Sequence, residues 1–446
     1  MSELTLSFIA KTFQLACSLP DFTVGKITTD SREVEKNDVF FALSGEKFDG
    51  HDFVDEVLAK GAVCIVSRCA QKTGTLKVAD TLQALAQLAK AWRKANPNTK
   101  VLAITGSSGK TTLKEMTAAI LRKTFGENAV LYTKGNLNNH IGLPLTLLGL
   151  RNHHQFAVLE MGMNHFGEIA FLSDIAQANI ALINNALNAH IGNGFDGVGD
   201  IAKAKSEIYT GLQNDGVAIF PANNVHQNIF QAACLNHAQR TFGIENGDIF
   251  SDNIRLLPTQ SYFDLHMSHQ TVAVSLPAAG RHNVLNATAA AALCADFATA
   301  EQIATGLADY QPVGSRLKMF QAACGTQIID DTYNANPDSM KAAIDVLSAF
   351  PAPRILVMGD MGELGEKSAE FHAEVGRYAQ QKNIEKALFI GEFSQHAATA
   401  FGNNAQWFAH KNELTEHLKT LLTPQTCVLV KGSRFMEMEK IVQAIE

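Results

Sequence analysis

Residues 104–112 read Ile-Thr-Gly-Ser-Ser-Gly-Lys-Thr-Thr, and this stretch decides how the rest of the chain is interpreted. The apolar run at 101–104 is typical of a buried strand, and residues 113–121 carry apolar side chains at helical spacing. A strand, a glycine-bearing turn that ends in Gly-Lys-Thr, and a helix form the context of a phosphate-binding loop. The glycines let backbone N–H groups converge on phosphate oxygens, and the helix N-terminus adds positive partial charge. The stretch therefore predicts nucleotide binding.

The loop departs from the full P-loop spacing at one position, because the pattern G-x-x-x-x-G-K-[ST] asks for glycine where this chain has Ile104. The alternative is a plain strand–turn–helix in which the glycines only reverse the chain. That alternative needs the strand, both glycines and Lys-Thr-Thr to coincide by chance, so we keep the functional interpretation. In it, Lys110 reaches the terminal phosphates and the Thr111 hydroxyl is a ligand of Mg²⁺.

The composition is that of a folded, acidic protein with several domains. At 446 residues the chain is too long for a single core. Its 46% hydrophobic and 18% charged residues exclude a disordered chain, and the net charge of −7 argues against a general nucleic-acid or anionic-membrane surface. We find no secretory signal at the N-terminus and no apolar run near the ~18 residues of a membrane span. The cysteines are scattered singly, as reduced thiols would be, and we predict a cytoplasmic enzyme.

Alternating strands and helices predict an α/β chain with domains at 1–82, 83–313 and 314–446. The second block implies a mainly parallel sheet covered on both faces, with a small antiparallel appendage at 249–277. The third block has the rhythm of a doubly wound domain, which places ligands at the carboxyl ends of its strands. The predicted strands are 38–43, 62–66, 101–104, 156–160, 180–183, 217–220, 271–275, 327–330, 354–358, 387–390 and 427–430, and the predicted helices are 51–60, 83–95, 113–121, 200–212, 283–296, 300–308, 338–349, 368–381 and 435–445.

The first block contains two polar segments, 28–32 and 45–51, that can be turns at strand ends. In the functional interpretation, Ser31 and Arg32 belong to a loop that hydrogen-bonds and neutralises an anionic ligand. Both interpretations stay open from the residues alone.

Further candidates follow the strands of the second block. Glu160 ends an apolar strand and could hold Mg²⁺ beside the phosphate loop, the alternative being a strand-terminal carboxylate in water. His190 lies in the polar loop after the strand at 180–183, where a single histidine is more often a surface residue than a ligand. Lys203 and Lys205 point to different faces of one helix, so at most one of them can face the site, and the residues alone favour the alternative of a solvated basic face.

These motifs resemble those of the Mur ligases, the ATP-dependent amide-forming ligases of peptidoglycan precursor synthesis, over essentially the whole chain. The family's phosphate loop lacks the same first glycine, which accounts for Ile104. The resemblance implies a small N-terminal UDP-substrate domain, a central P-loop ATPase domain with a parallel sheet, and a C-terminal Rossmann-like domain. The matching segments are Asp30–Arg32, Phe48–His51, Thr105–Thr112, Gly280–Asn286, Gly314–Arg316 and Asp330–Pro337.

The resemblance also implies ATP and Mg²⁺ as cofactors and small-molecule substrates, with no nucleic acid, no membrane span and a monomeric chain. It places catalytic roles on Lys110, Glu160, His190 and Lys205, and metal ligation on Thr111, Glu160, His190 and, if it is carbamylated, Lys205. It places ATP binding on Gly106, Ser107, Ser108, Gly109, Lys110, Thr111, Thr112, Asn283, Asn286, Arg316 and Asp331. It places UDP-substrate binding on Ser31, Arg32, Lys47, Asn136, Asn138 and Asn139.

Three further segments, 134–142, 164–168 and 359–365, resemble the family member that joins D-alanyl-D-alanine to UDP-N-acetylmuramoyl-tripeptide. The Asp-Asn-Pro-Arg tetrapeptide of the third-amino-acid-adding relative is absent, and residues 334–338 are more like the dipeptide-adding member. The implied reaction phosphorylates the tripeptide carboxylate, and the dipeptide amine then attacks the acyl phosphate. A related ligase, such as a folate-polyglutamating enzyme, and a non-catalytic P-loop protein stay open as alternatives. The third residue of the tripeptide, meso-diaminopimelate or lysine, also stays open.

A carbamylated lysine supports a second metal ion in the family, and the resemblance implies one here. Only a neutral amine reacts with CO₂, so the pKa of this lysine must lie below its reference value of about 10.4. We assign Lys205, because Tyr209 follows it at the family's spacing, with Lys203 as the lesser candidate.

Overall fold

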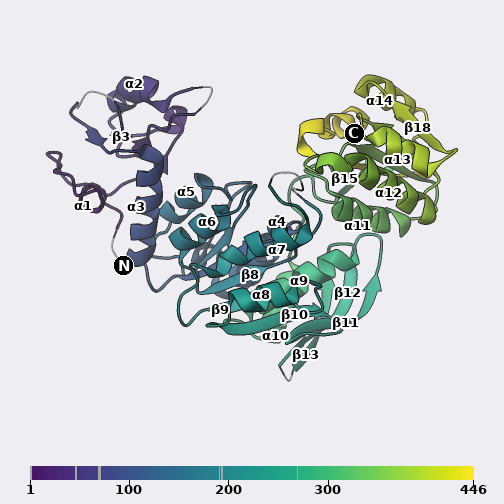
Figure 1. Cartoon of the computed structure of the whole chain (residues 1–446), viewed down its shortest axis with the longest axis horizontal. Helices are drawn as coiled ribbons and strands as arrows, with labels where there is room; N and C mark the ends of the chain where they lie inside the picture. Colours follow the sequence, from purple (N-terminus) through teal and green to yellow (C-terminus); the bar gives the residue numbers. More distant parts are fainter. Residues whose placement is uncertain (1–2, 46–47, 69–71, 190, 192–193, 269) are drawn as a thin grey trace.

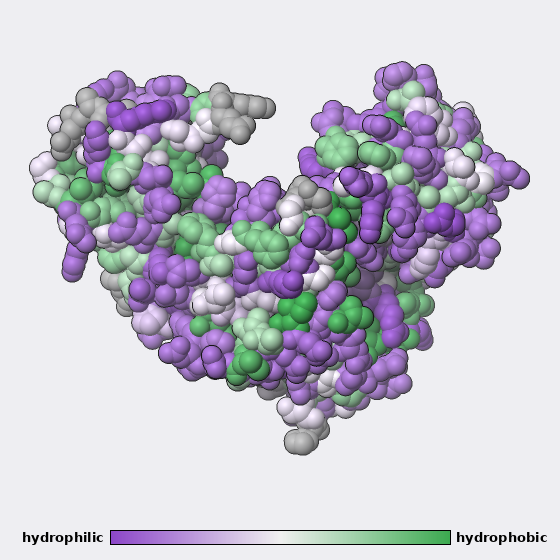
Figure 2. All heavy atoms as spheres, viewed as in Figure 1, coloured by the Kyte–Doolittle hydropathy of each residue, from purple (hydrophilic) through white to green (hydrophobic). Residues whose placement is uncertain are grey.

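The computed structural model is an α/β protein with three sheets, and it describes residues 3–45, 48–68, 72–189, 191, 194–268 and 270–446. The chain forms an N-terminal, a central and a C-terminal region, and the two outer regions stand on opposite sides of the central one (Figure 1). Figure 2 shows a hollow between the two outer regions, above the central region. Among the described residues, every helix is too short or too polar to traverse a lipid bilayer.

The N-terminal region is built on a four-stranded parallel sheet in the order β1-β2-β3-β4. The two inner strands are buried along their whole length, as expected for a parallel sheet that is covered on both faces. The elements are α1 (Leu6–Thr12), β1 (Ile27–Thr28), the 3₁₀ turn η1 (Ser31–Glu33), β2 (Val39–Phe41), η2 (Gly50–Phe53), α2 (Val54–Ala59), β3 (Val63–Val66) and β4 (Thr75–Lys77).

The first helix of the central region, α3 (Thr81–Ala95), begins at Asp80, whose carboxylate accepts hydrogen bonds from the N–H groups of Leu82 and Gln83. This helix contacts α1 and β2 on one side and α5 and α6 on the other. One apolar core therefore continues from the N-terminal sheet through α3 into the central region. The division at residues 82 and 83, like that at 313 and 314, stays a prediction.

The central sheet has nine strands in the order β13-β12-β11-β10-β9-β8-β5-β7-β6. Successive residues of β5 face opposite cores: Val101 and Ala103 pack on one side, and Leu102 and Ile104 on the other. The strands are β5 (Lys100–Thr105), β6 (Val130–Tyr132), β7 (Phe156–Glu160), β8 (Ile180–Ile183), β9 (Val217–Pro221), β10 (Ala238–Ile244), β11 (Ile249–Leu256), β12 (Ser261–Met267) and β13 (Gln270–Leu276).

Helices cover both faces of this sheet, with α3, α5 and α6 on one face and α4, α9 and α10 on the other (Figure 1). The helices are α4 (Lys110–Phe125), α5 (Gly142–Leu148), α6 (Glu168–Ala176), α7 (Val198–Ser206), followed by η4 (Glu207–Tyr209), α8 (Gln227–Ala233), α9 (Arg281–Cys294) and α10 (Ala300–Ala308), with η3 (Glu127–Ala129) before β6.

The antiparallel segment predicted as an appendage is part of the main sheet, so that expectation is wrong. Strand β10 pairs in parallel with both β9 and β11, and β11 to β13 continue the sheet as antiparallel strands. The sequence pattern missed β10 because its first residues, Ala238 and Gln239, are exposed and give no apolar alternation.

The C-terminal region has a six-stranded sheet in the order β14-β15-β19-β16-β17-β18, in which only the β14–β15 pair is antiparallel. The last helix starts at Glu439 and not at 435, because η6 and the left-handed Glu437 precede it. The elements are β14 (Lys318–Gln321), β15 (Gln327–Asp331), α11 (Pro337–Ser348), β16 (Arg354–Gly359), η5 (Gly365–Lys367), α12 (Ser368–Gln381), β17 (Lys386–Ile390), α13 (Ser394–Phe401), β18 (Ala405–Phe408), α14 (Lys411–Lys419), β19 (Cys427–Lys431), η6 (Arg434–Met436) and α15 (Glu439–Ile445).

Candidate active site

The loop between β5 and α4 has the shape of a phosphate cradle. Gly109 adopts φ 78°, in the left-handed region that favours glycine, and α4 begins directly after it. A Cβ atom at Gly109 would lie 2.6 Å from Asn286 Oδ1 and 2.8 Å from Asn184 Nδ2, so the position has no room for a side chain. The Lys110 ammonium donates to the Gly106 carbonyl, with 2.7 Å between Nζ and O, and so folds back over the loop. Thr112 follows in the first turn of α4.

A buried hydroxyl–carboxylate pair lies beneath this loop. The Thr111 hydroxyl donates to Glu160 Oε2 at 2.9 Å, and the Glu160 side chain is only 2% exposed. The register of β5 and β7 places Glu160 beside Ile104, at the start of the loop. Asn138 Nδ2 donates to the second carboxylate oxygen at 2.8 Å. Glu160 is therefore not a strand-terminal carboxylate in water.

Asparagine side chains brace the loop from the next strand. Asn185 and the Ser108 backbone form a two-way contact, in which the Ser108 N–H donates to Oδ1 at 2.9 Å and Nδ2 donates to the Ser108 carbonyl at 3.0 Å. Asn184 Nδ2 donates to the same carbonyl at 3.0 Å and to Asn286 Oδ1 at 2.9 Å. Neither asparagine is among the predicted site residues, although two asparagines directly after an apolar strand are a usable signal.

The oxygen donors around the loop fit a Mg²⁺ ion. Asn184 Oδ1 is buried and accepts no hydrogen bond from the described residues. The Thr111 hydroxyl and the Glu160 carboxylate are hard oxygen donors, the kind that Mg²⁺ prefers. The described residues contain no group of three His, Cys, Asp or Glu side chains able to hold a metal alone. Few protein oxygens, with phosphate oxygens and water as the remaining ligands, are typical of Mg²⁺ sites.

The two lysines of α7 have opposite environments. Lys205 is 2% exposed, and burial, together with the nearby Lys110 charge, holds its pKa well below the usual lysine value. The side chain of Lys203 is 62% exposed and donates to Asp200 at 3.1 Å. Tyr209 is buried and donates from its hydroxyl to the Ile219 carbonyl at 2.7 Å, which anchors the end of this segment in the core. The environment of Lys205 therefore favours a neutral amine.

The C-terminal region contacts the phosphate loop directly. Asn336 Nδ2 donates to the Ser108 hydroxyl at 2.8 Å, and the Asn188 N–H donates to Asp338 Oδ2 at 3.2 Å. Both C-terminal residues stand at the start of α11, where Asn336 is the N-cap. The sequence could not predict these contacts, which join residues more than a hundred positions apart.

Two predicted ATP-binding residues lie on this C-terminal face. The Arg316 guanidinium stacks on Tyr333, 3.6 Å from the ring centroid, and its charge lowers the pKa of Lys110, which burial already depresses. Asp331 Oδ2 lies 2.5 Å from Lys431 Nζ. Asn283, at the start of α9, donates to the Ala279 carbonyl at 2.8 Å and accepts a longer bond, 3.3 Å, from Asn286. Asn283 is linked to the phosphate loop through Asn286 and Asn184, and Arg316 lies near Lys110, whereas Asp331 pairs with Lys431.

The UDP-binding candidates that the structure describes lie in two regions, with Ser31 and Arg32 in the N-terminal region and the three asparagines in the central one. Ser31 is buried in η1, while the side chain of Arg32 is 85% exposed and lies 2.5 Å from the Asp30 carboxylate. Asn136 is exposed, and Asn139 accepts hydrogen bonds from the Ile141 and Gly142 N–H groups before α5. Only Asn138, through Glu160, reaches the phosphate site. His190 and Lys47 lie outside the described residues.

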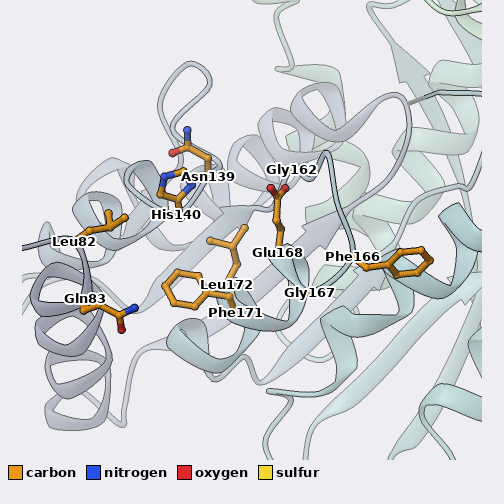
Figure 3. A pocket seen from close by; sticks show the side chains of 10 residues that line it. All are labelled: Leu82, Gln83, Asn139, His140, Gly162, Phe166, Gly167, Glu168, Phe171 and Leu172. Carbon is orange, nitrogen blue, oxygen red and sulfur yellow. The ribbon is translucent and has the colours of Figure 1, made fainter. Parts of the chain in front are cut away.

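A pocket of about 330 Å³ opens beside Asn138, where the start of α3 faces α6 (Figure 3). The Asn138 carbonyl accepts a hydrogen bond from the Gly162 N–H, and Gly162 lines the pocket. The walls combine apolar side chains with a few polar ones, as is usual for small-molecule sites. They are formed by Leu82, Gln83, Asn139, His140, Gly162, Phe166, Gly167, Glu168, Phe171 and Leu172.

Comparisons with known proteins agree with this architecture. Three family models match: "Mur ligase family, catalytic domain" at residues 23–93, "Mur ligase middle domain" at 104–294 and "Mur ligase, glutamate ligase domain" at 315–434. The UDP-N-acetylmuramoyl-tripeptide–D-alanyl-D-alanine ligase of Haemophilus influenzae is 42% identical, covering 95% of this chain and 94% of its own. The Escherichia coli ligase of the same name is 41% identical, covering 100% of this chain and 99% of its own.

Solved structures also resemble this chain. MurF from Acinetobacter baumannii superposes with a TM-score of 0.93 and 40% identity, covering 100% of this chain and 99% of its own. A MurF ligase from Thermotoga maritima, in complex with ADP, superposes with a TM-score of 0.84 and 28% identity, covering 94% and 96%. A folylpolyglutamate synthase from Mycobacterium tuberculosis shares the fold at a TM-score of 0.67, with only 14% identity and 82% of this chain covered.

Proposed function

The chain belongs to the Mur ligase family, and we propose that it joins D-alanyl-D-alanine to UDP-N-acetylmuramoyl-tripeptide at the expense of ATP. The products are the UDP-muramoyl-pentapeptide, ADP and phosphate. The observation that carries this proposal is identity of about 40%, over essentially the full length, with ligases of that name. The likeness to a folylpolyglutamate synthase extends to the fold alone and does not favour folate as the substrate.

The phosphate loop would bind the ATP tail and stabilise the phosphoryl group during its transfer. Backbone N–H groups at the start of α4 and the Lys110 ammonium face the place where negative charge is spread over the transferring group. These donors are held in place before the substrates bind, because the asparagines of the next strand fix the Ser108 backbone. The tripeptide carboxylate that attacks the γ-phosphate becomes an acyl phosphate, and the dipeptide amine displaces phosphate from it.

Mg²⁺ fits this site and would, when bound, neutralise charge on the phosphate oxygens. Thr111 and Glu160 are the residues that would hold it, since their oxygens already lie 2.9 Å apart. Asn138, bonded to the other oxygen of Glu160, would fix the orientation of that carboxylate.

Lys205 would support a second metal ion as a carbamate, together with His190. Its burial supplies the neutral amine that reaction with CO₂ requires, whereas the exposed Lys203 does not have that environment. Carbamylation converts an ammonium donor into an acceptor with carboxylate-like oxygens. The assignment of Lys205 in place of Lys203 therefore has a physical reason beside the spacing to Tyr209.

The UDP-muramoyl substrate would span the N-terminal and central regions. Ser31, Arg32 and Lys47 would bind its uridine-diphosphate end, and Asn136, Asn138 and Asn139 would bind nearer the reacting carboxylate. Asn139 is one of the residues that line the pocket beside Asn138. Because the hollow separates the outer regions, closure of the domains would accompany binding (Figure 2).

A coupled assay of phosphate release tests this function. Purified protein should release phosphate from ATP only when a UDP-muramoyl-tripeptide and D-alanyl-D-alanine are both present, and mass spectrometry should show the pentapeptide product. Assays in parallel with the meso-diaminopimelate and lysine forms of the UDP-muramoyl-tripeptide decide which third residue of the tripeptide the enzyme accepts. Turnover with folate plus glutamate, or none with any acceptor, would contradict the proposal. The cytoplasmic location and the monomeric state remain predictions from the sequence.

A further inference from the structure

A lysine that the proposed reaction does not use is buried in α4, one turn beyond the phosphate loop. Lys114 is 0% exposed. It follows Lys110 and Thr111 at helical spacing, so the three side chains share one face of α4. Removing a charge from water is costly, and lysine is rarely buried unless it is paired. The ammonium of Lys114 must therefore have strong partners inside the protein.

The partners of Lys114 connect α4 to the end of β6. Its Nζ donates to the Thr133 carbonyl at 2.6 Å and forms an ion pair with Glu115, with 2.8 Å between Nζ and Oε1. The same Nζ lies 5.6 Å from the centre of the Tyr132 ring, within the range of a cation–π contact. Tyr132 is the last residue of β6, and Thr133 follows it. Lys114 thus ties the chain that leaves β6 to the helix of the phosphate loop.

The segment that begins at Thr133, residues 133–138, is irregular in conformation. It leaves a three-residue strand at the edge of the central sheet, and residues 134–137 are exposed. Backbone hydrogen bonds hold its two ends: the Thr133 N–H donates to the Val158 carbonyl at 3.0 Å, and the Gly162 N–H donates to the Asn138 carbonyl at 2.8 Å. The bond from Lys114 is the side-chain contact that fixes the first end to α4.

Both ends of segment 133–138 also bond to Glu160. The buried Thr133 hydroxyl accepts a hydrogen bond from the Glu160 N–H at 3.0 Å. Asn138 Nδ2 donates to Glu160 Oε1 at 2.8 Å, while the Thr111 hydroxyl of α4 donates to Oε2. The Glu160 carboxylate is therefore oriented from two sides, by α4 and by this segment. The placement of the segment relative to α4 decides where the two oxygens point.

A buried cation can also be a purely structural anchor, and Arg93 of α3 provides the comparison. Arg93 is 1% exposed and donates to Asn179 Oδ1 at 3.1 Å, and the same oxygen accepts from the Val101 N–H at 2.9 Å. Val101 is near the start of β5, at the opposite end of that strand from the phosphate loop. Arg93 therefore anchors the far end of the sheet, whereas the contacts of Lys114 lead to Glu160.

We infer that Lys114 is a positioning residue for Glu160: by tying segment 133–138 to α4, it fixes the carboxylate that would hold Mg²⁺ beside the phosphate loop. The inference deepens the proposed function and rests on it, since the role of Glu160 in phosphoryl transfer belongs to that proposal. Groups that orient a metal-binding side chain commonly contribute roughly 10- to 100-fold to metal affinity or activity. An ammonium suits this task because it can donate to a carbonyl and to a carboxylate together.

The test compares Lys114→Met with Arg93→Met. Both variants replace a buried cation by an apolar side chain and should unfold at a lower temperature, so stability alone does not separate them. Mn²⁺, which takes oxygen ligands as Mg²⁺ does, is the probe, and EPR measures its dissociation constant from the full-length protein with ADP. K114M should raise this constant about tenfold, and R93M should leave it unchanged. An unchanged constant in K114M, or an equal rise in R93M, would overturn the inference.

Hydrogen exchange shows where each substitution acts. In K114M, amide exchange should accelerate in segment 133–138 and at Glu160. In R93M, it should accelerate around α3 and the start of β5 instead. Faster exchange in K114M that is spread evenly over the central region would indicate a general loss of structure and would overturn the inference.

Thr133→Val provides a second variant should K114M fail to fold. Valine keeps the branched shape of threonine but removes the hydroxyl that accepts from the Glu160 N–H. T133V should raise the Mn²⁺ dissociation constant in the same direction as K114M, and Thr133→Ser, which retains the hydroxyl, should restore most of the affinity. A constant that T133V leaves unchanged would overturn the inference.

Neither measurement requires an acceptor substrate, so the inference and the proposed function can fail separately. Absence of the pentapeptide from assays of the unmodified protein would refute the proposed function, whereas the Mn²⁺ and exchange comparisons decide the role of Lys114. If Mn²⁺ does not bind the unmodified protein with ADP, the inference is overturned, because Glu160 then holds no metal ion.

Discussion

The phosphate loop and the N-terminal segment around Arg32, which we propose to bind the two substrate phosphate groups, are built differently by the chain. Around the phosphate loop, side chains from β7, α4, α9 and the segments that follow β6 and β8 hold one another through hydrogen bonds. In the N-terminal segment, Arg32 is exposed and pairs with its own neighbour Asp30. The phosphate loop is therefore organised before any ligand binds. The N-terminal segment must instead break the contact between Arg32 and Asp30 when it binds a ligand. Substitutions should therefore affect kcat in the first region and KM in the second.

The largest effect is expected from Lys110→Ala. Loss of the only side-chain cation within the loop should lower phosphate release by roughly 10³-fold, because phosphoryl transfer depends on electrostatic stabilisation. Burial lowers the pKa of Lys110, so the charged side chain does not favour folding, and K110A should unfold at an equal or higher temperature. Phosphate release and thermal unfolding measure the two quantities.

Lys123→Ala is the control for this prediction, since Lys123 is on the same helix but pairs with Asp309 away from the loop. If K110A lost activity and stability together, the loop would be a structural element, and its contrast with the N-terminal segment would disappear.

The second prediction concerns the two lysines of α7. Lys205→Ala should lose activity on the order of 10²-fold, as removal of one pre-placed stabilising group commonly does, and short carboxylates should restore part of it. Lys203→Ala should stay near full activity, because its side chain is exposed and pairs with Asp200. Mass spectrometry of the intact protein in bicarbonate, together with the activity assay, provides the measurement. An unmodified Lys205 in crystals of fully active protein would contradict the proposed carbamate.

The third prediction tests the N-terminal half of the comparison. Arg32→Ala should raise KM for the UDP-tripeptide about tenfold while kcat changes little, as expected for a contact made equally in the ground and transition states. Lys36→Ala, another exposed cation of the same region, should leave both constants unchanged. A fall in kcat for R32A would show that the N-terminal segment shapes the reaction itself, contrary to the division drawn here.

The sequence was sufficient wherever the deciding signal is local. The phosphate loop, its strand and its helix are contiguous, so their pattern predicted the fold of that segment, while the binding roles of Lys110 and Thr111 stay predictions. The sequence could show that Lys203 and Lys205 face different sides of a helix. It could not show which of them is buried, because burial depends on the packing of α7. The bond from Asn336 to Ser108 joins residues 228 positions apart, and no local pattern encodes it. For the same reason β10 was recognisable only through its two neighbouring strands.

The smallest expected effect comes from His282, at the junction of the central and C-terminal regions. Burial lowers the pKa of His282 to about 4. Its neighbour Gly280 packs so closely on α11 that a Cβ there would lie 2.9 Å from Val346. If this junction is closed in solution, the NMR resonances of His282 should titrate near pH 4. If the junction is open, the pKa of His282 should return toward its usual value. NMR titration of the protein, with His282→Gln to assign the signal, makes the measurement.

The lowered pKa of His282 also determines the direction in which folding stability changes with pH. The folded state binds a proton on His282 less readily than the unfolded state, so the stabilising contribution is complete above pH 6.5 and is lost as the pH falls toward 4. The loss should be on the order of 1 kcal/mol, and H282Q should reduce it. If H282Q loses as much stability at acid pH as the unmodified protein, the C-terminal region is not packed against the central region in solution. The contact of Asn336 with the phosphate loop would then form only when ligand closes the domains.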